Sequence, residues 1–192
     1  MGLLTTDDFS NGFFKLPLDK FGKIRLEQYL IEFDDDQFLA PLFGKDEYAK
    51  YKADLDGNFI PQTAPYTTVF NALCDEVDPC DYICKLRYDH GKLNHECKEL
   101  LISKGIKDML KGFVYYNYLY DPKAQQTPVG VAILDSANSN AATDDQIASE
   151  AEARWNRSIH TYRSIQKYIA ANETDFPDFA GFPMYFKMEG IF

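Results

Sequence analysis

Residues 143–172, "TDDQIASEAEARWNRSIHTYRSIQKYIAAN", give the clearest helical pattern in the chain and decide its fold class. Thr143 and Gln146 fit a capping box, with two acids in the predicted first turn. The apolar positions that follow recur every three or four residues, which is the period of one helix face: Trp155, Ile159, Tyr162, Ile165 and Ile169. The stretch therefore predicts a long C-terminal helix with one buried side.

The patterns before this stretch also favour helices, so we expect a mainly α-helical bundle. Four short helices are predicted, over residues 19–33, 34–44, 46–55 and 64–74. Asp36 fits the N-cap of the second helix, and Gly44 fits its C-terminal stop. A longer helix is predicted from about Glu96 to Tyr120.

Two segments break the helical pattern. Residues 74–97 are irregular and rich in cysteine, as in an insertion. Residues 121–142 hold Pro122, Pro128 and Gly130 and then "VAIL", which predicts a loop that carries a small β-strand or hairpin element. We expect one helical domain over residues 1–172, followed by an extended tail over residues 173–192, where prolines and glycines leave no helical period.

The composition limits the classes of function. The chain has 192 residues, of which 45% are hydrophobic, which is enough for one domain with a core. Its net charge of -10 argues against binding nucleic acid by neutralising phosphates, but not against a protein through which DNA passes. No apolar run is long enough for a transmembrane helix, and the N-terminus does not resemble a signal peptide. We therefore expect a reducing cytoplasm and no membrane association.

The four cysteines leave three alternatives open. Cys74, Cys80, Cys84 and Cys97 lie within 24 positions, and two histidines lie between them. They can be ligands of a structural zinc ion, partners in reversible disulfides, or small buried thiols. No C-x2-C pair is present, and no phosphate-binding or nucleophile motif occurs in the chain. We therefore expect no enzyme and no cofactor, and a small zinc-binding regulatory or host-interaction module is the alternative function.

The second half of the predicted helix that ends at Tyr120 is aromatic on nearly every side. The polar side of its first half continues as Tyr115 and Tyr118, while Gly105 and Gly112 share one stripe and predict close approach by another element. Either the chain wraps its own central helix, or a second subunit covers the second half. We favour the second subunit, because so short a chain has few helices for full wrapping. Tyr115 and Tyr118 are then expected to be exposed in an isolated chain.

The tail and the loop offer similar choices. The tail aromatics can fold back on the chain's own core or dock on a partner: Phe176, Phe179, Phe182, Tyr185, Phe186 and Phe192. The loop stretch "TPVGVAIL", residues 127–134, can pair across a subunit boundary by strand addition.

Four stretches of the chain resemble a family of tailed-phage neck proteins. They are "LTTDDFSNGFFKLPLDKFGKIRLEQYLIEF", "IKDMLKGFVYYNYLYD", "QQTPVGV" and "RWNRSIHTYRSIQKYI". The similar proteins are the head-to-tail connector, or adaptor, rings of phages that infect Bacteroides and relatives, including crAss-like phages. The resemblance runs from about Leu4 to Ile169 and is weakest over residues 74–97.

The resemblance implies a structural virion protein and no catalysis. It implies a closed ring of copies, expected to be twelvefold, that docks on the portal protein, extends the DNA channel and carries further neck and tail proteins. The chain would be assembled in the host cytoplasm and lie in the virion neck. An acidic channel would repel phosphate, so that DNA slides through it.

Two sets of residues are expected at contacts in that ring. The predicted subunit interface comprises Tyr115, Tyr116, Tyr118, Tyr120, Val129, Val131 and Ile133. The residues predicted to dock on the portal or on a neighbouring ring are Phe179, Phe182, Tyr185, Phe186 and Phe192.

Overall fold

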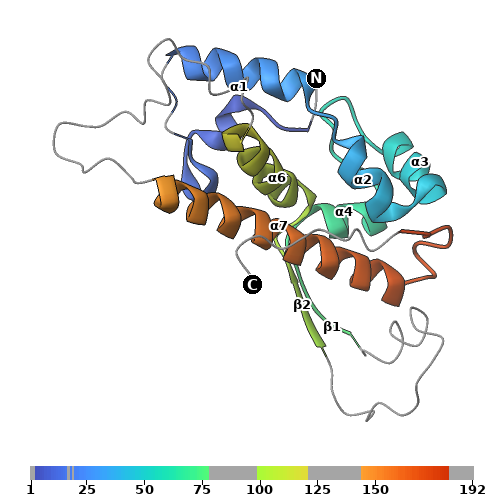
Figure 1. The fold of residues 1–192 in the computed structure, drawn as a ribbon. Helices are drawn as coiled ribbons and strands as arrows, with labels where there is room; N and C mark the ends of the chain where they lie inside the picture. Colours follow the sequence, from blue (N-terminus) through green and yellow to red (C-terminus); the bar gives the residue numbers. More distant parts are fainter. Residues whose placement is uncertain (1–2, 17, 19, 78–98, 121–143, 182–192) are drawn as a thin grey trace. The chain divides into compact units, whose positions relative to one another are not determined.

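The computed structural model describes residues 3–16, 18, 20–77, 99–120 and 144–181 (Figure 1). The fold is mainly α-helical, with a long C-terminal helix and a two-stranded antiparallel sheet, which confirms the predicted class. The elements are η1 Thr6–Phe9, η2 Gly12–Phe14, α1 Lys20–Glu32, α2 Asp36–Phe43, α3 Lys45–Ala53, α4 Ala64–Phe70, β1 Leu73–Val77, β2 Glu99–Ser103, α6 Ile106–Tyr120 and α7 Asp144–Ala171. None of the helices in these ranges combines the length and the apolar character that crossing a membrane requires.

The described residues fall into two compact units. The first unit takes those of Met1–Asp35 and Asp108–Ile159, and the second takes those of Asp36–Lys107 and His160–Tyr185. Most of α6 belongs to the first unit, and α7 contributes its first part to the first unit and its last part to the second.

The first unit is built around α6. Met109, Leu110 and Phe113 have no exposed surface, and Phe9 of η1 and Leu26 of α1 are equally buried. The backbones of α6 and α7 come close together at one glycine of α6. A Cβ atom on this Gly112 would lie 2.0 Å from the Ser158 Oγ atom and 2.7 Å from the Arg154 carbonyl oxygen. The predicted close approach is confirmed, and the approaching element is a helix of the same chain.

The second unit packs aromatic rings from α2, α3 and α4 against one another. The rings of Phe43 and Tyr51 stack with centroids 4.8 Å apart, and Tyr66 meets Tyr51 edge-on at 5.7 Å. In the last part of α7, the predicted apolar stripe is confirmed, since Tyr162, Ile165 and Ile169 have no exposed surface. The core of this unit thus combines aromatic rings from α2, α3 and α4 with the apolar stripe of α7.

The short helices agree with the sequence, with small differences at their ends. The four predicted short helices are present as α1, α2, α3 and α4. Asp36 is the first residue of α2 rather than its N-cap. Gly44 separates α2 from α3 and has a φ angle of 83°, a conformation that a glycine adopts without strain.

The prediction of one helix from Glu96 to Tyr120 is wrong, because α6 begins only at Ile106. Residues 99–103 form β2, which pairs with β1 so that Leu73 lies opposite Ser103. The turn between β2 and α6 needs Gly105, which has a φ angle of 87° and lies close to the Phe70 carbonyl oxygen. The β element predicted over residues 121–142 lies outside the described residues.

Candidate functional site

The expectation that Tyr115 and Tyr118 are exposed in an isolated chain is wrong. Tyr115 is 5% exposed and Tyr118 is 8% exposed. The guanidinium of Arg154 lies 4.5 Å from the centre of the Tyr115 ring, and Tyr29 of α1 meets the Tyr118 ring edge-on at 5.5 Å. Burial raises the pKa of the Tyr115 hydroxyl. The chain therefore wraps this part of α6 itself, and these two tyrosines are not carried into a proposed interface.

The charged residues on the polar side of α6 are partly covered by other elements of the same unit. Lys111 forms an ion pair with Asp8 of η1 at 3.2 Å, and Asp108 forms one with Arg157 of α7 at 3.0 Å. Both pairs are partly buried, because the elements that cover α6 bring the opposite charges with them. The polar stripe of α6 thus carries charge pairs that are half-buried.

The remaining predicted tyrosines of α6 belong to a line of contacting rings that leads from the surface to the core. Tyr120 is 45% exposed and lies 4.7 Å from Tyr116, measured between ring centroids. Tyr116 lies 4.7 Å from Trp155, and Trp155 lies 5.0 Å from the fully buried Phe113. We call these four residues the aromatic ladder. It places an exposed aromatic side chain against other rings of the same unit, as in anchors of protein interfaces.

The first part of the tail folds back on its own chain. Phe176 is 1% exposed and meets the Tyr66 ring edge-on at 5.9 Å. Phe179, predicted to dock on a partner, is half-buried against Leu101 and Ala170. As far as Gly181, the tail therefore folds back on the chain's own core, which was the first of the two predicted alternatives. The other predicted contact residues lie outside the described residues: Val129, Val131, Ile133, Phe182, Tyr185, Phe186 and Phe192.

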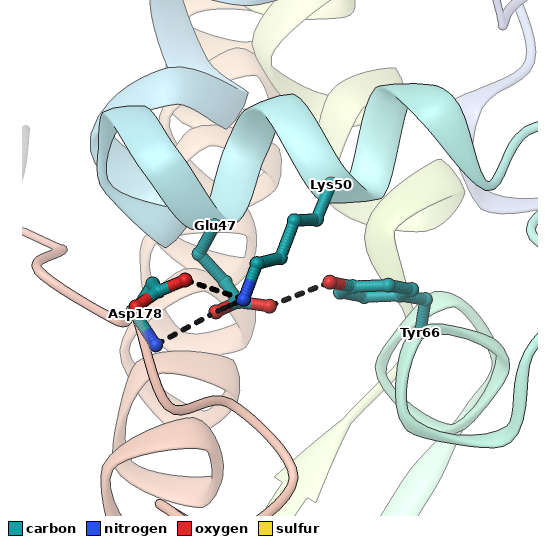
Figure 2. Close-up of polar contacts among 4 residues, drawn as sticks. All are labelled: Glu47, Lys50, Tyr66 and Asp178. Carbon is teal, nitrogen blue, oxygen red and sulfur yellow. Dashed lines mark hydrogen bonds and ion pairs between the residues drawn. The ribbon is translucent and has the colours of Figure 1, made fainter.

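Four polar residues fasten this tail segment to α3 and α4, and Figure 2 shows them together. Glu47 has no exposed surface, and its carboxylate accepts a hydrogen bond of 2.5 Å from the Tyr66 hydroxyl. The same carboxylate accepts one of 3.1 Å from the backbone N–H of Asp178. The Lys50 Nζ atom lies 3.9 Å from Glu47 and forms an ion pair with the Asp178 side chain. We call these residues the tail clasp.

Glycines let the tail approach α2 and α3 closely beside the tail clasp. A Cβ atom on Gly44 would lie 2.6 Å from the Ala180 carbonyl carbon, and one on Gly181 would lie 2.4 Å from the Leu42 carbonyl oxygen. The backbone N–H of Ala180 donates a hydrogen bond of 3.2 Å to the Phe43 carbonyl. The chain is therefore held in place up to the point where most of the predicted docking aromatics begin.

The sequence did not predict the tail clasp. Glu47 stands in the strongly charged stretch "DEYAKYKADL", which is typical of a solvated helix. One local signal exists, because Glu47 lies four residues before the buried Tyr51 and therefore on the same helix face. Its partners Tyr66 and Asp178 are 19 and 131 positions away, so no local pattern connects them with Glu47.

The cysteine segment is mostly outside the described residues. Cys74 lies in β1, is exposed, and stands opposite Ile102 in the sheet. Cys80, Cys84 and Cys97 lie outside the described ranges. In the ranges that are described, no group of three or more histidine, cysteine, aspartate or glutamate side chains is placed to hold a metal ion. The zinc site therefore stays a prediction.

Replacing Tyr66 with Phe is expected to reduce the loss of stability at alkaline pH. Burial, together with the hydrogen bond to Glu47, raises the pKa of Tyr66 above its ordinary value of 10.0. Its stabilising contribution is therefore complete below pH 10.0 and is lost as the pH rises from there through the folded-state pKa, since the unfolded chain releases the proton first. Urea denaturation from pH 8 to pH 11 measures the slope, which is the fall in the free energy of unfolding per pH unit. The control Ile60→Val, at an exposed side chain that does not titrate, should keep the wild-type slope, and an unchanged slope in Tyr66→Phe would contradict this account.

Comparisons with known proteins find no relative of this chain. No family model matches it, and no curated protein and no solved structure matches it. A likeness to connector ring proteins therefore depends on the four stretches of sequence that resemble that family.

Proposed function

We propose that the chain is a structural, ring-forming head-to-tail connector that docks on a portal protein and extends its DNA channel. The observation that carries the proposal is the aromatic ladder. Tyr120 ends a helix that is otherwise largely buried, and it is exposed while its ring rests on Tyr116. An aromatic side chain held in this way loses little conformational entropy when a partner covers it, which favours an interface anchor.

The position of Tyr120 in the chain fits a contact between neighbouring copies. The predicted interface residues Val129, Val131 and Ile133 follow it within the next 13 positions. A contact between two different surfaces of adjacent copies builds a ring when the rotation closes. The portal contact is assigned to the aromatic residues that follow Gly181, because the tail clasp fixes the chain up to that point.

The charge of the chain supports a passage for DNA and not a binding site for it. The chain has 30 acidic residues against 20 lysines and arginines, which gives the net charge of -10. A ring repeats this charge in every copy, so its surface repels phosphate and offers DNA few places to bind. This like-charge repulsion favours a channel through which DNA slides.

Replacing Tyr120 with Ala is expected to weaken ring formation on the portal by at least about tenfold, because the exposed anchor is lost. Native mass spectrometry of the chain mixed with the purified portal protein measures the ring. The matched control is Ile102→Ala, at a side chain that is 53% exposed in the second unit. Assembly of Tyr120→Ala at wild-type concentrations would overturn the interface. The portal must be present, because a connector can remain monomeric until the portal templates the ring.

A further inference from the structure

Helix α1 presents a face that is exposed among the residues the structure describes. Ile31 is 70% exposed and Ile24 is 46% exposed, while Leu26 and Leu30 on the opposite face are buried. The two isoleucines are seven positions apart, which is two helical turns, so they lie on the same side of α1. We call this side the outer face of α1, and its exposed members are Lys20, Lys23, Ile24, Glu27, Gln28, Ile31 and Glu32.

The charges on the outer face change sign along the helix. Lys20 and Lys23 precede Ile24, while Glu27 and Glu32 lie in the second half of the helix. A helix with one basic half, one acidic half and apolar residues in each is complementary to a second copy of itself that runs antiparallel. In that antiparallel arrangement, Ile24 of one copy lies level with Ile31 of the other. The basic half of each copy then meets the acidic half of the other.

We propose that the outer face of α1 is an interface between two copies of this chain, related by a twofold axis. A second copy fits because it matches both halves of the face at once. An acidic or a basic partner would match one half and be repelled by the other. Lys23 of this face also forms an ion pair with Asp7, which is 3.9 Å long and solvent-exposed, and a pair of this kind contributes little.

The proposed dimer is weak and reversible. A helix of 13 residues is about 20 Å long, and a single pair of such helices buries less than the roughly 1,200 Å² that stable complexes need. A twofold contact closes on two copies and cannot build a ring. The dimer is therefore separate from the connector ring, whose proposed anchor is Tyr120, and it pairs chains that are not yet in the ring.

Charge exchange on α1 tests the proposal with the full chain. Lys20→Glu combined with Lys23→Glu makes the outer face acidic, and Glu27→Lys combined with Glu32→Lys makes it basic. Analytical ultracentrifugation over a series of protein concentrations is expected to show self-association of the wild type, and association at least about tenfold weaker for each variant alone. An equimolar mixture of the two variants should associate about as tightly as the wild type. Addition of salt should weaken association of the wild type and of the mixture, and should lessen the repulsion between copies of either variant alone.

An apolar substitution supplies an independent check. Ile31→Asp should abolish self-association, whereas Ile60→Asp, at a side chain 46% exposed in the second unit, should leave it unchanged. Thermal melts of every variant establish that the fold is intact. A wild type that stays monomeric at all concentrations overturns the proposal, and so does a mixture of the two charge variants that does not associate. Neither result bears on ring formation on the portal, which is measured separately by native mass spectrometry of the Tyr120→Ala variant.

Discussion

Glu47→Ala is expected to lower the free energy of unfolding by about 3–5 kcal/mol, as removal of one partner from a buried polar network does. The carboxylate has no exposed surface, and it accepts hydrogen bonds from the Tyr66 hydroxyl and the Asp178 backbone. The substitution leaves both donors without this acceptor and opens a cavity between α3 and α4. Urea denaturation at neutral pH measures the change, and hydrogen exchange at the Asp178 amide shows whether the tail is released.

The adjacent acid of the same helix turn provides the control. Asp46 is exposed and also lies in the first turn of α3, so Asp46→Ala removes a charge there without opening the tail clasp. Its expected cost is about 0.3–1 kcal/mol, which is the usual effect of a charge at a helix N-terminus. Equal costs for Glu47→Ala and Asp46→Ala, with no faster exchange at Asp178, would show that the tail clasp does not hold the tail.

Gly112→Ala is expected to destabilise the protein by about 1–3 kcal/mol, although alanine in a helix interior normally stabilises by about 1 kcal/mol relative to glycine. The added Cβ atom would lie 2.7 Å from the Arg154 carbonyl oxygen, and this backbone atom cannot move without shifting α7. Thermal and urea denaturation measure the change.

Two further variants separate this steric effect from a general effect of glycine. A Cβ atom added at Gly57 would have no other atom within 4 Å, so Gly57→Ala should change stability by less than about 0.5 kcal/mol. Ser158→Ala in the Gly112→Ala background removes the contact at 2.0 Å but keeps the Arg154 carbonyl, so it should restore only part of the loss. A Gly112→Ala protein as stable as the wild type would mean that α6 and α7 do not pack this closely.

Local patterns predicted the helices because each of them carries its own signal. The apolar positions Ile159, Tyr162, Ile165 and Ile169 of α7 are all fully buried, as their spacing indicated. Strand β2 was predicted as helix because its sequence "ELLIS" runs directly into the pattern of α6. Its partner β1 is paired across a separation of more than 20 positions, and a pairing of this kind leaves no local pattern.

The candidate contacts were harder to predict because burial depends on distant partners. Tyr115 and Tyr118 continue a polar stripe, and the sequence alone does not show that Arg154 and Tyr29 cover them. Tyr120 lies near the end of the same pattern and is exposed. What separates it from Tyr118 is the packing around each ring, since the two residues are of the same type.

The central claim is that this chain forms a ring beside a portal, and its location in an intact virion tests that claim most directly. Electron cryomicroscopy of the intact particle measures both the position and the copy number of the chain. The connector proposal predicts one closed ring of copies in contact with the portal, with the Tyr120 side chains covered by neighbouring copies. Absence of the chain from the particle, or its presence only at sites away from the portal, would contradict the proposal.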